Sequence, residues 1–296
     1  MSPVNVPRFD LQSHSIHSDG ALPPAEVVQR AATAGIELLA LTDHDGVDGV
    51  DEALDAARTV GIGLVPAVEL SAVHDAREDL HVLGYGIDHH DQAFAGRTAE
   101  ARADRFTRAE RMADRLRELG FEVDEGPLKR RRDSGRAIGR PHLSKAVVDH
   151  PANRERLQQE GLQTVETFLP AYLIPGRPGY LPRERPTVPE AIGWIHDAGG
   201  VAVWAHPFWD VESPEEVLET VNSFQTQGLD GVECFYVTHT REQTELLVGH
   251  CSAHGLLRTG SADVHGPDHA LFNRFGAFEL YGLEANLGPL AEFEHR

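Results

Sequence analysis

The chain has 296 residues, of which 41% are hydrophobic and 25% charged, a composition typical of a globular protein of one large or two small domains. Its formal net charge of −20, from 27 Lys and Arg against 47 Asp and Glu, disfavours nonspecific binding to long nucleic acid. The sequence shows neither an apolar run of ~18 residues, the length of a membrane span, nor a secretory signal, so we expect a cytoplasmic protein. Its two cysteines make no disulfide framework, and we expect both thiols to be reduced.

The first ninety residues alternate between predicted strands and helices. The strands are rich in Leu, Val and Ile, and the helices end at Gly. In chain order we predict a strand at 8–12, a helix at 24–35, a strand at 36–44, a helix at 49–61, a strand at 62–70 and an extended run at 80–88.

The same rhythm resumes after residue 186. Ser213 is a predicted N-cap, with Pro214 in the first turn of the helix that it opens. The predicted elements are a helix at 188–200, a strand at 201–207, a helix at 213–228, a strand at 229–236, a helix at 240–255 and a strand with its following loop at 256–266. Such alternation favours a parallel sheet with right-handed crossovers, so the predicted fold is α/β, a distorted (βα)7 barrel.

Residues 93–185 break this rhythm. They contain a long helical pattern at 97–120, a basic segment at 129–136 that we predict to be a loop, and several Pro and Gly turns. We therefore predict one discontinuous barrel domain, residues 1–92 and 186–296, with a helical insertion at 93–185 that covers the site.

Imidazoles and carboxylates gather at the ends of the predicted strands. In a βα barrel the carboxyl ends of the strands meet at one mouth, so side chains placed there converge. The candidates are His14, Asp19, Asp43, His44, Glu69, His81, His206, Asp263 and His265. Mixed nitrogen and oxygen ligands suit Zn, Mn or Fe, with Mg also considered. The candidates outnumber the three or four ligands of one catalytic zinc, which predicts two to three divalent metals and favours phosphate ester hydrolysis.

Six motifs in order resemble those of the PHP (polymerase and histidinol phosphatase) family: "FDLQSHSIHSDG", "LALTDHDGVDG", "VPAVELS", "HVLGYGID", "WAHP" and "SADVHG". The resemblance covers residues 8–90 and about 190–266. The insertion, with "GRPHLSKAVV" and "PGYLP", resembles a subgroup whose members are similar to phosphatases of nucleotide 3′,5′-bisphosphates and to 5′–3′ exonucleases.

Carried over residue by residue, the resemblance implies three metal positions. The first uses position 12, His14, Glu69 and Asp263; the second uses Glu69, His81 and His206; the third uses Asp19, His44 and His265. Asp43 fits no position, and we expect it to hold a neighbouring imidazole in its tautomer.

Position 12 departs from the family pattern, because Gln12 stands where the family has its first His. An amide oxygen is a weaker ligand than an imidazole, and the amide can equally bond water or substrate. We expect a working site with one labile or absent ion. His17 is interpreted as a residue near the site without a metal, and replacement of the missing nitrogen or contact with substrate are the alternatives.

The insertion carries the candidate phosphate contacts. Arg140 and His142 are the predicted substrate-binding residues, and Arg140 is expected to hold the phosphate that does not react; its alternative role is to cap a helix beginning at Pro141. The run from Lys129 to Arg140 is strongly basic within an acidic chain. Arginines also recur at every third position from Arg102 to Arg111, where a solvated face paired with neighbouring acids is favoured over a second phosphate contact.

These features predict a metal-dependent phosphoesterase. Its expected substrates are small: phosphate monoesters of nucleotides (3′,5′-bisphosphates) or short 5′-phosphorylated oligonucleotides, cleaved by a metal-activated hydroxide, with neither a membrane nor long duplex nucleic acid as a partner. The candidates for the general acid are His206, His265 and a metal-bound water. Three alternatives remain: a histidinol-phosphate-type phosphatase, an amidohydrolase-type hydrolase of C–N or lactone bonds, and a metal-depleted, non-catalytic binding protein.

Overall fold

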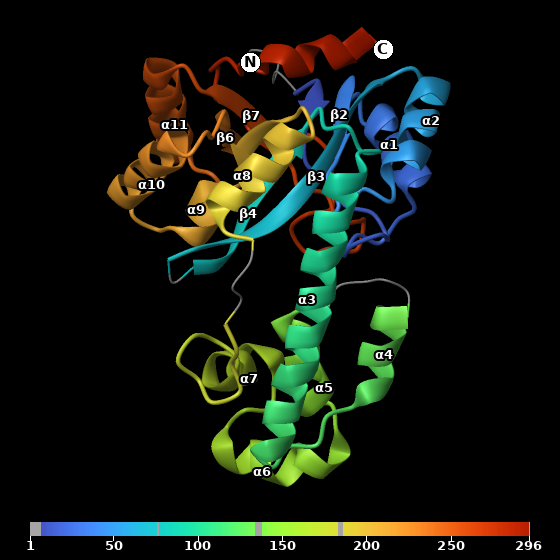
Figure 1. Ribbon diagram of the computed structural model, residues 1–296, viewed down its shortest axis with the longest axis vertical. Coiled ribbons are helices and arrows are strands. Elements are labelled where there is room, and N and C mark those ends of the chain that lie inside the picture. The colour runs from blue at the N-terminus through green and yellow to red at the C-terminus, as the bar shows by residue number, and fades with distance from the viewer. Residues whose placement is uncertain (1–6, 76, 134–137, 183–185, 296) are drawn as a thin grey trace, which may run out of the picture. The chain divides into compact units, whose positions relative to one another are not determined.

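The computed structural model describes residues 7–75, 77–133, 138–182 and 186–295 (Figure 1). The chain divides into two compact units: Met1–Thr98 with Pro186–Arg296, and Ala99–Arg185. The first unit contains the sheet and the second is helical. The predicted domain boundaries lie at 92/93 and 185/186, and helix α3 (Gln92–Glu118) runs through the first of them.

Seven strands form one sheet in the order β1 to β7. Hydrogen bonds from Leu11 N–H to Gly260 C=O (3.2 Å) and from His14 N–H to Val264 C=O (2.9 Å) join the segment of the first strand to that of the last. The sheet is therefore nearly closed into a barrel, which confirms the predicted fold class. The strands are β1 (Phe9–Asp10), β2 (Leu38–Leu41), β3 (Gly63–His74), β4 (Arg77–Tyr85), β5 (Val201–Trp204), β6 (Gly231–Tyr236) and β7 (Leu257–Ser261).

One strand causes the distortion of the barrel. β4 is antiparallel to both β3 and β5, whereas the other neighbouring strands pair in parallel. β3 ends at His74 and β4 begins at Arg77, whereas a parallel pair would need a crossover of a dozen or more residues. β3 also continues to His74, so the expectation that Glu69 ends this strand is wrong: Glu69 lies in its interior.

The helices of this unit cover the outside of the barrel. Ser213 accepts a hydrogen bond from Glu216 N–H (3.4 Å), which confirms the predicted cap of α10. The segments are α1 (Pro24–Thr33), α2 (Val50–Val60), α8 (Val188–Asp197), α9 (Pro207–Asp210), α10 (Pro214–Thr226), α11 (Arg241–His254) and the 3-10 helix η2 (Gly288–His295). Within the described ranges, the structure has no helix that combines the length and apolarity needed to cross a membrane.

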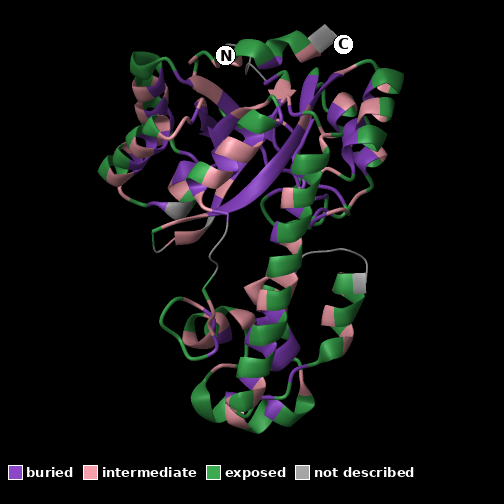
Figure 2. Ribbon diagram, in the orientation of Figure 1, coloured by how far each residue is buried: buried purple, intermediate pink, exposed green. Residues whose placement is uncertain are grey.

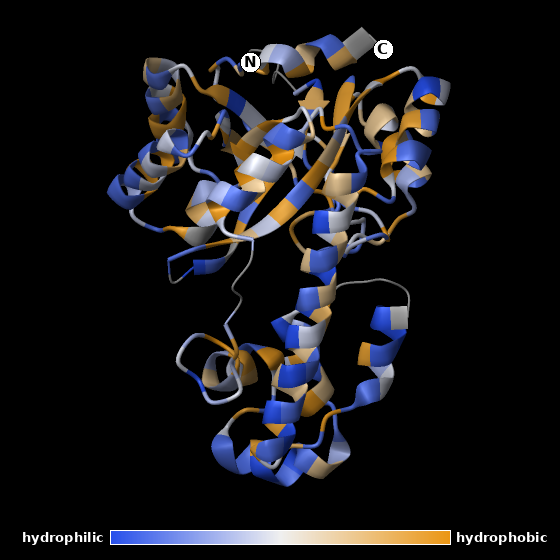
Figure 3. Cartoon of the chain, in the orientation of Figure 1, coloured by the Kyte–Doolittle hydropathy of each residue, from blue (hydrophilic) through white to orange (hydrophobic). Residues whose placement is uncertain are grey.

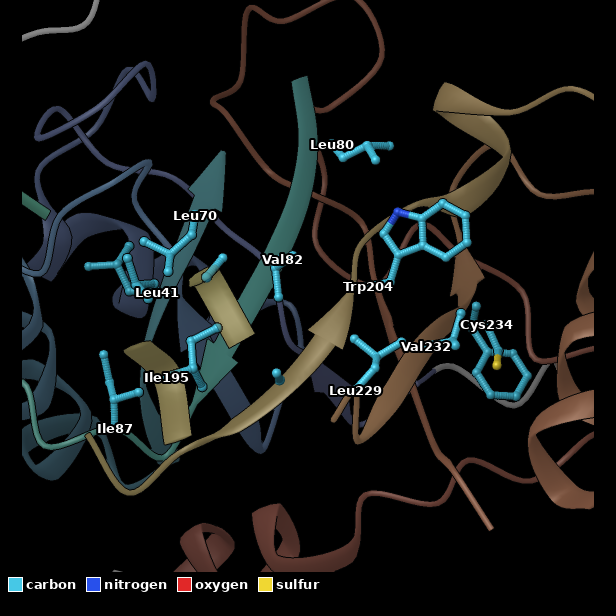
Figure 4. Packing of buried hydrophobic residues seen from close by; sticks show 14 of the residues in the cluster. Leu41, Leu70, Leu80, Val82, Ile87, Ile195, Trp204, Leu229, Val232 and Cys234 are labelled. Carbon is cyan, nitrogen blue, oxygen red and sulfur yellow. The ribbon is translucent and has the colours of Figure 1, made fainter. Parts of the chain in front are cut away.

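The two faces of the strands belong to two apolar clusters, as period-2 alternation requires. Leu38 and Ala40 of β2 point into the barrel, and Leu39 and Leu41 pack outward against the helices. Because both faces are buried, a strand such as β2 is a continuous hydrophobic run (Figures 2 and 3). Figure 4 shows the outer cluster, where Ile195 of α8 packs among strand residues such as Val82.

The second unit packs short helices around its own core. Phe121, Phe168 and Tyr172 make mutual ring contacts at its centre, with centroids 4.9–5.2 Å apart. Its segments are most of α3, α4 (Glu125–Asp133), α5 (Arg140–Val148), η1 (Pro151–Asn153), α6 (Arg154–Glu160) and α7 (Val165–Tyr172). The predicted loop at 129–136 is wrong for its basic half, because Lys129–Arg132 continue α4; residues 134–137 lie outside the described ranges.

Candidate active site

Glu69 lies at the centre of a cluster of imidazoles. It is fully buried, and its Oε1 lies 2.7 Å from His81 Nδ1 and 3.4 Å from His206 Nε2. Its Oε2 lies 3.1 Å from His14 Nε2 and 3.5 Å from His44 Nδ1. One carboxylate therefore faces two pairs of histidines, one pair at each oxygen.

The antiparallel course of β4 brings His81 into this cluster. His81 lies in the middle of β4 and is paired with Ser71 of β3, two residues beyond Glu69, so its side chain reaches the end of the barrel where the other ligands lie. His81 C=O accepts a hydrogen bond from Ala205 N–H (3.1 Å), which fixes the neighbouring His206 segment beside it. The ring nitrogens His81 Nδ1 and His206 Nε2 are 3.2 Å apart.

Asp19 is the centre of a second group. Its carboxylate oxygens lie 3.5 Å from His44 Nε2, 3.5 Å from His265 Nε2 and 3.6 Å from His14 Nδ1. His265 Nδ1 lies 2.7 Å from the carbonyl oxygen of Asp263, an arrangement that directs Nε2 toward Asp19.

Asp263 connects the two groups on the side of β7. Its Oδ1 lies 3.0 Å from His14 Nε2 and 3.6 Å from His265 Nδ1. The parallel bridge between Ser13 and Val264 sets these neighbouring segments side by side. All eight predicted ligands are thus brought together at one end of the barrel.

The donor set fits divalent cations. Four buried ligand atoms have no hydrogen-bond partner within the described structure although they lie close to one another: His14 Nε2, His44 Nδ1, Glu69 Oε2 and Asp263 Oδ1. Buried polar atoms are normally satisfied, and unpaired ones that converge on a point are what a bound ion would satisfy. These side chains form two sets, and within each set all ligand atoms lie within 4.8 Å of one another. One set is His14, Asp19, His44 and His265; the other is His44, Glu69 and His81, so the two sets share His44. These sets differ from the metal positions implied by the resemblance in two ways. His14 lies with Asp19, His44 and His265, and His44 takes the place of His206 beside Glu69 and His81.

Attraction between the imidazoles and the carboxylates of the cluster favours the charged forms of both. Burial alone would lower the pKa of His14, but the Asp263 and Glu69 carboxylates outweigh it and raise that pKa well above its ordinary value. Burial would raise the pKa of Glu69, and the imidazoles of His44 and His81 instead hold it well below its usual range. The cluster therefore combines anionic carboxylates with basic imidazoles, a donor set that exchanges protons for metal.

Backbone strain accompanies the ligands. His206 has φ 31° and Asp263 has φ 54°, two of the five positive-φ residues other than Gly in the described ranges. Such conformations are unfavourable for residues with a Cβ and persist where the surrounding structure imposes them. His206 N–H is held in place by Glu233 Oε2 (2.9 Å).

Asp43 does not have the expected role. Its carboxylate accepts hydrogen bonds from Ser15 N–H (2.8 Å), Ser15 Oγ (2.6 Å) and Ser18 Oγ (2.6 Å), and no imidazole of the described residues donates to it. Ser18 Oγ lies 3.4 Å from His14 Nδ1, so Asp43 acts on His14 only through Ser18. Asp43 fixes the loop between two ligands, His14 and Asp19.

Three supporting residues were missed by sequence analysis. Tyr236 Oη donates to Asp263 Oδ2 (2.8 Å), and Ser261 Oγ donates to Glu233 Oε1 (2.5 Å). Burial raises the pKa of Glu233 to about 8. Glu233 and Tyr236 lie in β6 and Ser261 ends β7, so the strand-end rule that found the ligands could have included them.

Gln12 is fully buried beside these residues. Its Oε1 accepts a hydrogen bond from Ser261 Oγ (3.3 Å), and its Nε2 has no partner within the described structure. The amide oxygen is thus already bonded to a serine hydroxyl. His17 lies beside Gly49 at the start of α2 and belongs to neither set of ligand atoms, so the structure does not support it as a substitute for the missing imidazole.

The predicted phosphate contacts lie in the helical unit. α5 begins at Arg140, and His142 Nδ1 accepts a hydrogen bond from Gly139 N–H (3.1 Å), which caps the helix. Arg108 of the predicted basic stripe donates to Leu181 C=O (2.8 Å) in the same unit. Contact of Arg140 and His142 with phosphate, and coverage of the site by the insertion, stay predictions.

Comparison with known proteins agrees with this site. Residues 10–123 match the PHP domain. A 3′,5′-nucleoside bisphosphate phosphatase of Chromobacterium violaceum is 35% identical over 259 residues, which cover 88% of this chain and 87% of the relative. The chain belongs to the PHP family. It is accordingly a metal-dependent phosphoesterase, as the sequence predicts.

A second curated relative and a solved structure are also similar to this chain. A 5′–3′ exoribonuclease of Haemophilus influenzae is 31% identical over 260 residues, covering 88% of this chain and 90% of the relative. The solved structure of an amidohydrolase from Chromobacterium violaceum, with bound sulfate and no metal, is similar with a TM-score of 0.74 and 31% identity. It covers 96% of this chain and 93% of that one. PHP membership thus rests on sequence and fold together.

Replacing Gln12 by His is expected to raise the amount of metal that the protein retains. In the ligand set implied by the family pattern, an imidazole at this buried position would add a nitrogen ligand to His14, Glu69 and Asp263. The measurement is metal per chain by elemental analysis after gel filtration from Mn²⁺. Gln12→Ala is the control and should match the wild type. Unchanged metal content and activity in Gln12→His would show that position 12 does not face an ion.

Proposed function

We propose that the protein removes phosphate from nucleotide 3′,5′-bisphosphates or cleaves short 5′-phosphorylated oligonucleotides. The observation that carries the proposal is the convergence of unpaired, buried ligand atoms around Glu69. The names of the two curated relatives, one a phosphatase and one an exoribonuclease, support the nucleotide class. We propose two to three divalent ions, Mn, Zn or Fe with Mg as a further candidate, and a cytoplasmic location.

Different residues would bind metal, transfer protons and bind phosphate. Glu69 would hold metal together with His14, His81 and His206, which lie near its oxygens. Asp19, His44, Asp263 and His265 would complete the ligand set. Divalent ions, when bound, would supply an activated water and neutralise charge on the phosphate. His206 and His265 are proposed to help protonate the leaving oxygen when their rings are not bound to an ion, and Arg140 with His142 to bind the phosphate that does not react.

A substrate panel tests this proposal. With Mn²⁺, the purified protein should show its highest kcat/KM for adenosine 3′,5′-bisphosphate or a 5′-phosphorylated trinucleotide, with histidinol phosphate and a lactone as comparison substrates. Chromatography of products separates loss of the 3′-phosphate from stepwise release of mononucleotides. A preference for histidinol phosphate or the lactone, or no turnover of nucleotides with Mn²⁺, Zn²⁺, Fe²⁺ or Mg²⁺, would overturn the proposal.

The phosphate-binding role has a matched control on the same helix. Arg140→Ala should raise KM about tenfold to a hundredfold, since a charged hydrogen bond contributes roughly 1.5–3 kcal/mol. Lys145, an exposed cation of α5 that pairs with Asp149, provides the control. Equal kinetics of Arg140→Ala and Lys145→Ala would remove Arg140 from the substrate site.

A further inference from the structure

An exposed tryptophan stands close to the metal ligands. Trp209 has 56% of its surface exposed and lies on α9, three residues after His206. Its ring centroid is 5.7 Å from that of Phe272, and the Phe272 ring is 5.4 Å from the ring of His265. A single ring therefore separates the exposed indole from a predicted ligand.

The loop that follows His265 fixes the position of Phe272. His265 N–H donates to Phe272 C=O (2.9 Å), and His269 Nδ1 accepts hydrogen bonds from the N–H groups of Leu271 (3.2 Å) and Phe272 (3.0 Å). The His269 ring also stacks on Phe272, with centroids 4.9 Å apart. A ring held in this way needs little ordering when a ligand arrives, which favours binding.

Apolar exposure is concentrated near the ligands. The exposed large hydrophobic residues of the described chain are Ile16, Trp209 and Leu271. All three lie in segments that carry predicted ligands: the loop after β1, α9 after β5 and the loop after β7. Scattered exposed apolar side chains are ordinary, but their gathering beside a catalytic cluster is typical of a ligand-binding surface.

We propose that the exposed ring of Trp209, supported by the buried ring of Phe272 (together the aromatic platform), binds the nucleobase of the substrate. The inference rests on the proposed function, because it assigns the base of a nucleotide whose phosphate is at the metal ligands. Aromatic rings bind bases by stacking and tolerate every base, because each presents a π face. The platform would thus confer preference for nucleotides over other phosphate esters without selecting one base.

Binding of a product and of its analogue without a base tests the platform without requiring turnover. Isothermal titration of the Mn²⁺-loaded protein compares adenosine 5′-monophosphate with ribose 5-phosphate, which lacks the base. Trp209→Ala should weaken binding of adenosine 5′-monophosphate about tenfold or more and leave that of ribose 5-phosphate unchanged. Trp209→Phe keeps a ring and should restore most of the affinity.

Fluorescence gives a second readout with a matched control. Adenosine 5′-monophosphate should quench the emission of the wild type and of Trp194→Phe, which removes a half-buried tryptophan of α8. Trp209→Phe should lose this quenching. Metal content and the melting temperature are measured for each variant, so that loss of fold is recognised.

The possible outcomes separate this inference from the proposed function. If Trp209→Ala weakens binding of both ligands equally or of neither, or if the wild type binds adenosine 5′-monophosphate no more tightly than ribose 5-phosphate, the platform is overturned. If the protein cleaves no nucleotide bisphosphate or oligonucleotide, the proposed function fails, and the binding comparison still decides whether the rings hold a base.

Discussion

Glu69→Gln should reduce kcat/KM by more than about a hundredfold and strip the protein of tightly bound metal. Substitutions that disturb only the outer partners of metal ligands already cost about 10–100-fold, and Glu69 faces imidazoles at both oxygens. The amide keeps the shape of the side chain but removes its charge. Each pair of histidines would lose its shared anion.

The measurement combines steady-state kinetics with elemental analysis of the same sample. Glu279→Gln provides the control, because Glu279 is exposed and the change removes the same charge from the surface. Circular dichroism should show an unchanged fold in both variants. A Glu69→Gln protein with wild-type metal content and activity would mean that the cluster around Glu69 is not the metal centre.

Much of the barrel could be predicted from sequence because its signals are local. Leu38 to Leu41 form an apolar run short enough for a buried strand, and Ser213 with Pro214 marks the start of a helix. The antiparallel β4 was not predicted, because its direction is set by the short connection from His74 to Arg77 and not by the residues within the strand. Because β3 pairs with β4 as far as His74, the strand extends beyond Glu69, which therefore lies in its interior.

The ligands were predictable for a different reason. A barrel brings the ends of distant strands together, so chemistry could be assigned to His14, Glu69 and Asp263 without knowing any distance. The partners of Asp43 could not be predicted in this way. They depend on how the loop from His14 to Gly20 turns, which directs Ser15 and Ser18 toward that carboxylate.

That turn requires glycine. A Cβ on Gly20 would overlap the carbonyl group of His14 and lie 2.6 Å from Ser15 N. These are backbone atoms and cannot move aside as a flexible side chain would. The next residue, Ala21, donates its N–H to His265 C=O (2.7 Å), so the turn is also attached to the segment of another ligand.

Gly20→Ala is therefore expected to separate His14 from Asp19 and to reduce both metal content and kcat/KM by about a hundredfold, as disturbed ligand support does. Gly193→Ala is the matched control: this glycine lies in α8 with open space around it, so alanine there should be neutral or stabilise by about 0.4–1 kcal/mol. Kinetics, elemental analysis and thermal unfolding are measured on both variants. If Gly20→Ala retains its metal and its rate, the loop tolerates the added methyl group, and the close approach of Gly20 to His14 is not what holds the two ligands in place.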